Sequence, residues 1–299
     1  MPNLYILDVK KGNSTVLLDT QGTVVIDAGK GRYLLEFLLE KQIQSIDILL
    51  LSHADEDHID GVRRILEYGT IKIKQVFVNP DISKQTKAWH DLVYALDDHD
   101  KDESDKSILD IGLTTNLTGK LNQGMVHIEI IAPRPSFVSA GTNYLRQKAT
   151  SNSLSAVIRL IYENKPIVLL TGDIDEIGFA NILHKNSDIH AHLLVFPHHG
   201  GRAGKDIKAF TTQICNHVQP QHIVFSIAKN IDKFPIKEVV ETISSVLPKT
   251  YMYTTNHSDI FSSHISQHEI PHKNDVGHIH IDLAQLPMII NYFKNNHLI

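Results

Sequence analysis

The decisive stretch for the fold is Leu51-Ser52-His53-Ala54-Asp55-Glu56-Asp57-His58-Ile59-Asp60-Gly61. An aliphatic run, 46–51, precedes the paired histidines and is short enough to be a buried strand. After them Val62, Ile65 and Leu66 recur at helical spacing. Two histidines and two aspartates therefore occupy a loop where a strand passes into a helix, which is where open α/β sheets place their functional sites.

These four side chains predict a metal site. Imidazole and carboxylate groups both bind Zn, Mn or Fe, so one short loop can surround an ion. Two alternatives stand beside this interpretation. Asp57 or Asp60 could cap the helix, or the loop could bind calcium, although Gly61 falls one position late for that motif and Ile59 occupies a ligand position. The paired histidines favour the metal site over both.

The pattern His53-x-Asp55-x-Asp57-His58-x-x-Gly61 resembles the metal signature of the metallo-β-lactamase fold superfamily, whose commoner form has His in place of Asp55. The Asp form resembles the hydrolase domain of bacterial competence-type DNA-uptake channel proteins. The resemblance implies an α/β fold, a four-layer αββα sandwich of two mixed β-sheets flanked by helices. The expected meander of strands 4–9, 14–18 and 23–26 leads to Asp27, which would either orient a ligand from below the site or serve as a turn carboxylate.

Two later strand ends carry the other candidates. The expected strand 166–170 leads to Asp173, which looks like the bridging aspartate of the family. The expected strand 191–196 leads to His198 and His199, which resemble the His-His-Gly motif of the uptake-channel branch. Ser normally follows that motif where Gly201 stands, and a later motif usually has His where Phe234 stands.

The resemblance implies two divalent ions, Zn or Mn, held by His53, Asp55, Asp57, His58, Asp173, His198 and His199. Asp173 would bridge, His53 and Asp55 would hold one ion, and Asp57, His58 and one histidine of the 198–199 pair would hold the other. A water between the ions would lose its proton near neutral pH and become the nucleophile, with Asp57 and Asp173 as the catalytic carboxylates.

The superfamily has a further histidine before the bridging aspartate, and the corresponding segment here, 150–153, has none. The shell of the first ion is therefore expected to be rich in oxygen, which suits Mn as well as Zn and favours phosphoryl transfer. We predict a hydrolase of a phosphodiester, in DNA or another nucleotide-containing substrate. The alternatives are a hydrolase of a lactone, lactam or thioester, and a non-catalytic binding protein stabilised by metal. Arg202 and Lys205 would contact an anionic substrate or be solvated loop charges.

Bulk composition narrows the class of protein. The net charge of −5 gives no global attraction to nucleic acid, so a protein partner could supply such contacts. A lone cysteine, Cys215, excludes an internal disulfide and is expected to be a buried apolar residue. No apolar run approaches the ~20 residues of a membrane helix, so we expect a cytoplasmic protein without membrane contact.

Residues 1–299 are expected to form one domain. Within it, 97–125 and 257–276 are expected to be insertions or loops. The acidic run 97–103 is expected to be a solvated loop. Residues 257–276 contain His257, His264, His268 and His272, whose spacing could also bind metal on a helix. In the expected strand 278–281, the histidines should share one face and the isoleucines the other.

Overall fold

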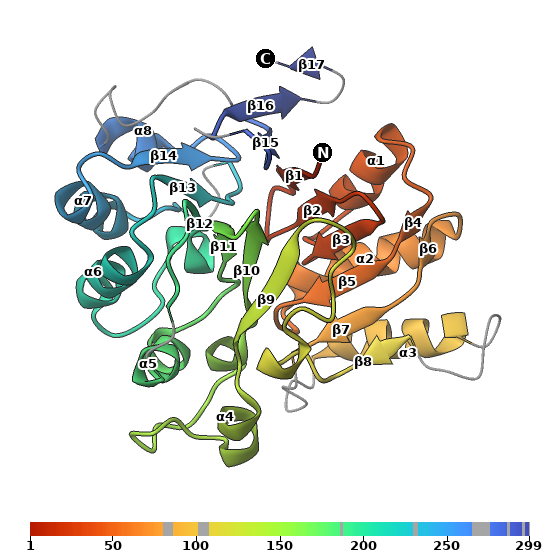
Figure 1. Ribbon diagram of the computed structural model, residues 1–299, viewed down its shortest axis with the longest axis horizontal. Helices are drawn as coiled ribbons and strands as arrows, with labels where there is room; N and C mark the ends of the chain where they lie inside the picture. The colour runs from red at the N-terminus through yellow and green to blue at the C-terminus, as the bar shows by residue number, and fades with distance from the viewer. Residues whose placement is uncertain are drawn as a thin grey trace.

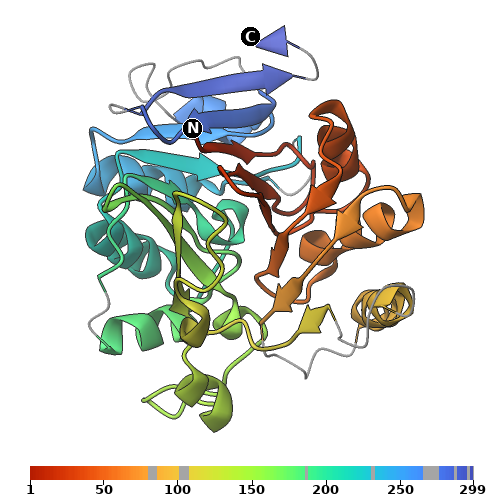
Figure 2. The ribbon, with the colours of Figure 1, turned by 45° about the vertical axis from the view of Figure 1, so that its right-hand side comes forward.

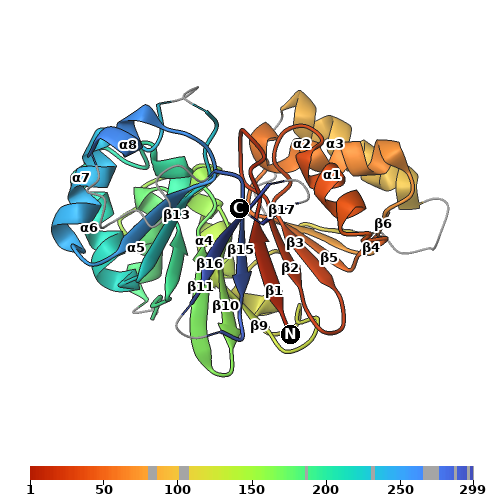
Figure 3. The same ribbon diagram turned by 90° about the horizontal axis from the view of Figure 1, so that it is seen from above.

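Two mixed β-sheets pack face to face, and helices cover the outer face of each (Figure 1). This computed structural model describes residues 1–79, 86–100, 108–185, 188–229, 233–264, 276–285, 288–294 and 297–298. Figure 3, seen from above, separates the two halves, with α1 to α3 beside the first sheet and α5 to α8 beside the second. The expected four-layer αββα sandwich is confirmed.

The first sheet combines the N-terminal strands with three strands from the C-terminal end of the chain. Within the described residues its order is β17 (His297–Leu298), β16 (Ile290–Lys294), β15 (His278–Asp282), β1 (Asn3–Ile6), β2 (Thr15–Leu18), β3 (Thr23–Ile26), β5 (Ile48–Leu51), β7 (Val76–Val78) and β8 (Leu109–Asp110). The predicted antiparallel meander β1-β2-β3 is confirmed, and β5 then pairs parallel to β3. Three helices flank this sheet: α1 (Tyr33–Glu40), α2 (Glu56–Tyr68) and α3 (Lys87–Asp100).

The second sheet has the order β14 (Tyr251–Thr254), β13 (His222–Phe225), β12 (Leu193–Val195), β11 (Lys165–Leu170), β10 (Val157–Tyr162) and β9 (His127–Ala132). Strands β11 to β14 are parallel, so their carboxyl ends meet at one edge. The helices that follow are α4 (Pro135–Ala140), α5 (Glu176–His184), α6 (Ile207–Val218), α7 (Lys237–Val246) and α8 (Asp259–His264). Short 3-10 turns lie at η1 (Thr115–Leu117), η2 (Asn152–Leu154) and η3 (Pro197–Gly200), and β4 (Ser45–Ile46) pairs with β6 (Lys72–Ile73).

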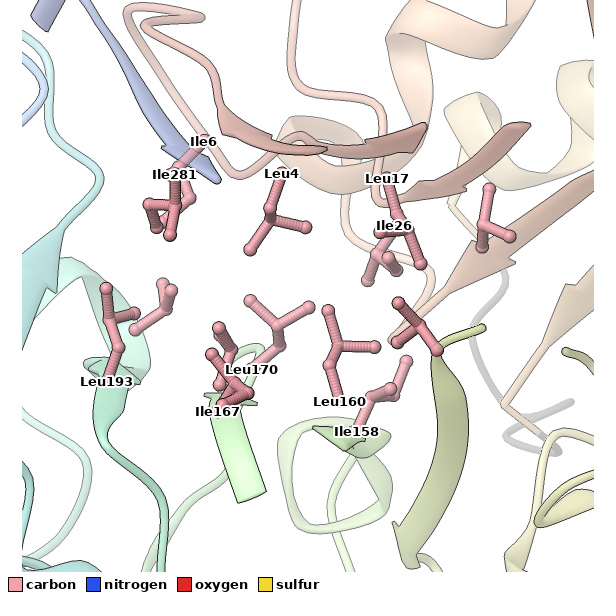
Figure 4. Packing of buried hydrophobic residues seen from close by; sticks show 14 of the residues in the cluster. Leu4, Ile6, Leu17, Ile26, Ile158, Leu160, Ile167, Leu170, Leu193 and Ile281 are labelled. Atoms are coloured by element: carbon pink, nitrogen blue, oxygen red, sulfur yellow. The ribbon is translucent and has the colours of Figure 1, made fainter. Parts of the chain in front are cut away.

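The main apolar core lies between the sheets (Figure 4). Leu4 and Ile6 of β1 point into it, whereas Tyr5 between them belongs to the cluster under α1 and α2. This alternation follows from the two-residue period of a strand. The same period is confirmed in β15, where Ile279 and Ile281 join the inner core. His278 and His280 instead contact aromatic rings on the other face.

Several predicted boundaries were wrong. The acidic run 97–103 was expected to be a loop, but α3 continues through Asp100, because Leu92 and Leu96 anchor the helix while Asp97 and Asp98 remain solvent-exposed on it. Residues 101–103 lie outside the described ranges. Segment 97–125 also contains β8, the edge strand of the first sheet, and η1.

The segment 257–276 also differs from the expected loop. It contains α8, which forms because buried Phe261 packs in the apolar cluster between the second sheet and its covering helices. His268 and His272 lie outside the described residues, and His257 pairs with Asp259 at 2.8 Å. Among the described residues, no helix has the length and apolar character needed to cross a bilayer.

Cys215 lies in α6 with 0% exposure, as predicted, and burial raises the pKa of its thiol to about 12. Because the thiolate is the reactive form, we expect iodoacetamide to leave the folded protein unmodified near pH 8 and to label it only under unfolding conditions. Mass spectrometry across a urea series checks this. Rapid labelling in native buffer would contradict the burial of this side chain.

Candidate metal centre

The predicted ligand side chains come from three strand ends and converge at one place. His53 follows β5, and Asp57 and His58 lie in the first turn of α2. Asp173 follows β11, and His198 and His199 lie in η3 after β12. Ligand atoms of His53, His58 and Asp173 lie within 4.8 Å of one another, and so do those of Asp57, His58 and His199. These groups could hold metal ions.

Asp173 is the hub of the cluster. Its Oδ2 lies 3.9 Å from Nε2 of His53 and 3.5 Å from Nδ1 of His198. Its Oδ1 lies 3.4 Å from Nε2 of His58 and 3.7 Å from Nε2 of His199. Each carboxylate oxygen therefore faces its own pair of imidazoles.

This geometry separates the two adjacent histidines. His199 lies on the side of Asp57 and His58, whereas His198 shares an oxygen of Asp173 with His53, whose Nε2 is also 3.9 Å from Asp55. The sequence left the assignment of this pair open and predicted a side around His53 that is poor in nitrogen. In the structure each oxygen of Asp173 faces two imidazoles. The expected oxygen-rich shell is therefore absent from these candidate ligands and does not support a preference for phosphoryl transfer.

Backbone conformation produces this split. His198 and His199 have φ of 50° and 58°, and Gly200 follows with φ of 83°. A histidine in the left-handed region costs roughly 1–3 kcal/mol and persists only where its surroundings hold it. Here Nδ1 of His199 donates to the carbonyl of Ser226 at 2.8 Å. With this backbone conformation both rings lie beside Asp173.

Further hydrogen bonds orient the other rings. Nδ1 of His58 donates to Oδ2 of Asp27 at 2.8 Å, and Asp27 in turn accepts from the backbone and hydroxyl of Ser52. The same hydroxyl lies 3.0 Å from Nδ1 of His53. Of the two roles predicted for Asp27, the structure therefore supports the one in which it orients a candidate ligand. Binding at Nδ1 leaves Nε2 of each ring facing the cluster, as ligand histidines require.

The capping alternative for the loop is wrong. Asp55 occupies the N-cap position of α2 but makes no capping hydrogen bond through its side chain. Asp57 already lies inside the first turn, and Asp60 instead accepts a hydrogen bond from the backbone of Gly31.

The electrostatics of the cluster suit cations. Within the described residues, Nε2 of His58, Nε2 of His199 and Oδ1 of Asp173 are buried without a hydrogen-bond partner. Each such atom costs about 1–3 kcal/mol unless something satisfies it. Burial lowers the pKa of His58, but Asp173 and Asp27 outweigh this and hold it well above its usual value. Burial raises the pKa of Asp173, but His58 and then His199 hold it well below its usual value. Divalent cations would satisfy these atoms.

A cavity of about 560 Å³ opens above the cluster. Asp57, Asp173, His198 and His199 contribute to its lining. Its lining also includes the cationic Lys10, Lys11 and Arg202, the apolar Ile227, Ala228, Phe234 and Ile236, and the small residues Gly12, Gly201 and Ser226. Arg202 also pairs with Glu238 at 3.0 Å, while Lys205 is not among the lining residues. The size is within the usual range for small-molecule sites.

Sequence reasoning missed four residues here, Ser52, Ser226, Lys10 and Lys11. Ser52 and Ser226 act through hydrogen bonds that depend on tertiary contact, so the sequence did not assign them these roles, although Ser226 lies in the later motif that contains Phe234. The two lysines adjoin Gly12 in the turn between β1 and β2. Two adjacent lysines beside a glycine, in a turn after a strand, were the signal in the sequence that could have identified them.

Comparison with known proteins relates the N-terminal part of the chain to one family. Residues 7–141 match the family model described as the metallo-beta-lactamase superfamily. This part of the chain belongs to the metallo-β-lactamase superfamily. The matched region includes the 53–61 loop, and Asp173 and the two adjacent histidines lie beyond it.

Solved structures that resemble this one align with most of the chain. A metallo-β-lactamase fold protein, YhfI from Bacillus subtilis, is 10% identical over 86% of this chain and 97% of its own, with a TM-score of 0.50. Igni18, a metallo hydrolase from Ignicoccus hospitalis KIN4/I, is 14% identical over 86% and 97%, with a TM-score of 0.48. A diphosphatase from the PhnP family is 11% identical over 86% and 96%, with a TM-score of 0.48. No curated protein matches significantly. At such identities the likeness to YhfI establishes the fold alone.

Proposed function

We propose that this protein is a hydrolase that depends on two divalent cations and cleaves a phosphodiester in DNA or another nucleotide-containing substrate. One observation carries the two-cation part of the proposal. The two oxygens of buried Asp173 face separate pairs of imidazoles, each pair joined by a further aspartate. Seven ligand groups exceed the needs of one tetrahedral ion.

The residues divide into two sets that share Asp173. His53, Asp55 and His198 would hold one ion, and Asp57, His58 and His199 would hold the other. Zn or Mn bound there would supply Lewis acidity and activate water for attack. Asp27, Ser52 and the carbonyl of Ser226 keep the imidazoles in place, because each holds a ring nitrogen that faces away from the cluster.

The cations of the cavity support an anionic substrate. Lys10, Lys11 and Arg202 lie around the opening of the site, where a phosphate group would meet their positive charge. Lys10 and Arg202 are each partly neutralised by a neighbouring carboxylate, Asp8 and Glu238. This charge distribution favours a phosphodiester over a lactone, lactam or thioester, whose reacting groups are neutral.

A basic arm supports nucleic acid as the source of that phosphodiester. Between residues 130 and 162 the chain contains no Asp or Glu. Helix α4 and the loop after it project from the sheets (Figures 1 and 2), and the loop exposes Tyr144, Arg146 and Lys148. Its base, Thr150 to Asn152, lines a second cavity with the metal-site candidates Asp55 and His198, and Asp175, Glu176 and Arg202 are among its other lining residues. The base of the arm therefore adjoins two candidate ligands of the metal centre.

We expect the double variant Arg146→Glu/Lys148→Glu to bind a single-stranded oligonucleotide more weakly. The slope of log affinity against log salt should become shallower by about 0.7 for each phosphate that the variant no longer neutralises. Fluorescence anisotropy at several salt concentrations measures both. A matched control, Lys208→Glu/Lys249→Glu, makes the same charge change on exposed residues elsewhere. Equal effects of the two double variants would assign the weaker binding to net charge and not to the arm.

The proposed activity is tested with protein loaded with Zn or Mn, its metal content measured on the same preparation. DNA, RNA and bis-p-nitrophenyl phosphate form one arm of the substrate panel, and nitrocefin and acyl-lactones form the other. Cleavage in the first arm alone is the expected result. Cleavage only in the second would assign the lactam or lactone reaction. If loaded protein cleaves nothing but melts at a higher temperature than chelated protein, the protein is a metal-stabilised binding protein.

A further inference from the structure

We propose that Phe234, with Gly201 beside it, forms a flat aromatic subsite that binds the nucleobase next to the phosphate held at the metal centre. This inference rests on the proposed function and names the part of the substrate that the apolar side of the cavity recognises. Activation of water by two cations makes no use of this apolar side.

The ring of Phe234 lies directly against the metal centre. It stacks almost parallel on His199, with an interplanar angle of 17° and centroids 6.5 Å apart. Phe234 is only partly buried, and it lines the cavity together with Ile227, Ala228 and Ile236. The ring therefore adds an apolar surface next to His199, one of the candidate ligands.

Gly201 provides the space that the ring occupies. A Cβ at Gly201 would lie 2.8 Å from Cζ and 2.9 Å from Cε1 of Phe234, and 3.0 Å from the carbonyl oxygen of His198. Such separations leave no room for a side chain while the ring holds its position. The two places where the sequence departs from the uptake-channel pattern, Gly201 and Phe234, thus lie next to each other.

The cavity has complementary sides. Lys10, Lys11 and Arg202 supply positive charge on one side. On the other side, the described residues of segment 227–236 that line the cavity are all apolar: Ile227, Ala228, Phe234 and Ile236. A nucleotide has the same division between an anionic phosphate and a planar, weakly polar base. Every base has a π-face that can stack on an aromatic ring, so this subsite would be tolerant of base identity.

The test compares binding of two probes that differ only by the base, dAMP and 2-deoxyribose 5-phosphate, to metal-loaded protein by calorimetry. We expect the variant Phe234→Leu, which stays apolar but loses the planar face, to bind dAMP roughly tenfold more weakly. Its affinity for the sugar phosphate should remain that of the parent. Tyr94→Leu, which removes an exposed ring on α3, is the control and should change neither affinity.

A second pair of variants tests the packing of Gly201 against the ring. Gly201→Ser should lower the melting temperature and weaken dAMP binding, because the new side chain displaces the ring. Adding Phe234→Ala should recover most of the decrease in melting temperature but not the affinity for dAMP. Neighbours in contact are expected to deviate from additivity in this way.

The subsite is disproved if Phe234→Leu weakens both probes equally, if it weakens neither, or if the parent binds dAMP no better than the sugar phosphate. Additive melting temperatures for Gly201→Ser and Phe234→Ala would disprove the coupling. Failure of the proposed hydrolase activity would appear separately, as intact substrates in the panel of phosphodiesters, lactams and lactones, since binding of dAMP needs no turnover.

Discussion

Substituting Asp173→Asn is expected to abolish both cation binding and hydrolysis. The loss in kcat/KM should exceed about a hundredfold, the upper figure for losing an outer partner of a metal ligand. The reason is geometric, because both oxygens of this carboxylate contact imidazoles and no other side chain of the cluster faces all four rings. An amide keeps the shape but removes the negative charge and one acceptor.

Metal analysis and activity on bis-p-nitrophenyl phosphate, measured on one preparation, check this result. Asp206→Asn is a matched control, because this exposed residue caps α6 by accepting a hydrogen bond from the backbone N–H of Ala209, which asparagine does equally well. Full activity and full metal content in Asp173→Asn would remove the basis for a shared bridging carboxylate. Absence of metal with unchanged hydrolysis would show that the reaction takes place elsewhere.

The substitution Gly12→Ala should be the most damaging change outside the ligands. Gly12 has φ of 98°, and a Cβ there would overlap the backbone carbonyl of Asp57. The carbonyl of Gly12 also accepts a hydrogen bond from Ser226 at 2.8 Å, so the turn joins two sides of the metal centre. A left-handed backbone costs alanine about 1–2 kcal/mol. Overpacking adds about 1–3 kcal/mol. We therefore expect the free energy of unfolding to fall by both amounts and cation affinity to fall with it.

Gly141→Ala separates the two contributions. Gly141 also has a positive φ, 63°, but no atom lies within 4 Å of the position of its Cβ. The Gly141→Ala variant should therefore lose only the free energy of unfolding that the left-handed backbone costs, and it should keep full cation affinity. Urea unfolding and metal titration of both variants provide the comparison. Equal decreases in the two would mean that the approach of Gly12 to Asp57 does not support the site.

The matched pairs also distinguish a catalytic site from a structural one. If metal only stabilises the fold, Asp173→Asn and Gly12→Ala should lower the melting temperature, and loaded parent protein should cleave no substrate of the panel. If the site is catalytic, the parent turns over and Asp173→Asn loses activity beyond what its change in stability explains.

The sequence alone determined the parts of this protein that depend on short-range chemistry. The spacing of His53, Asp55, Asp57 and His58 predicted their convergence, because one loop between a strand and a helix carries all four. Asp173 and the adjacent histidines could be placed because carboxyl ends of parallel strands share an edge. The alternation along residues 278–281 likewise predicted that the isoleucines of β15 share one face and its histidines the other.

Tertiary structure decided which atom faces which. The division of His198 and His199 between the two sides of Asp173 depends on left-handed backbone angles that residue type does not report. Gly12 beside Asp57 and Gly201 beside Phe234 are contacts between segments distant in sequence. Contacts between distant segments also explain three elements that the sequence did not predict, namely the longer α3, the edge strand β8 and the helix α8. Their free energy comes from burial against partners elsewhere in the chain, which local propensity does not contain.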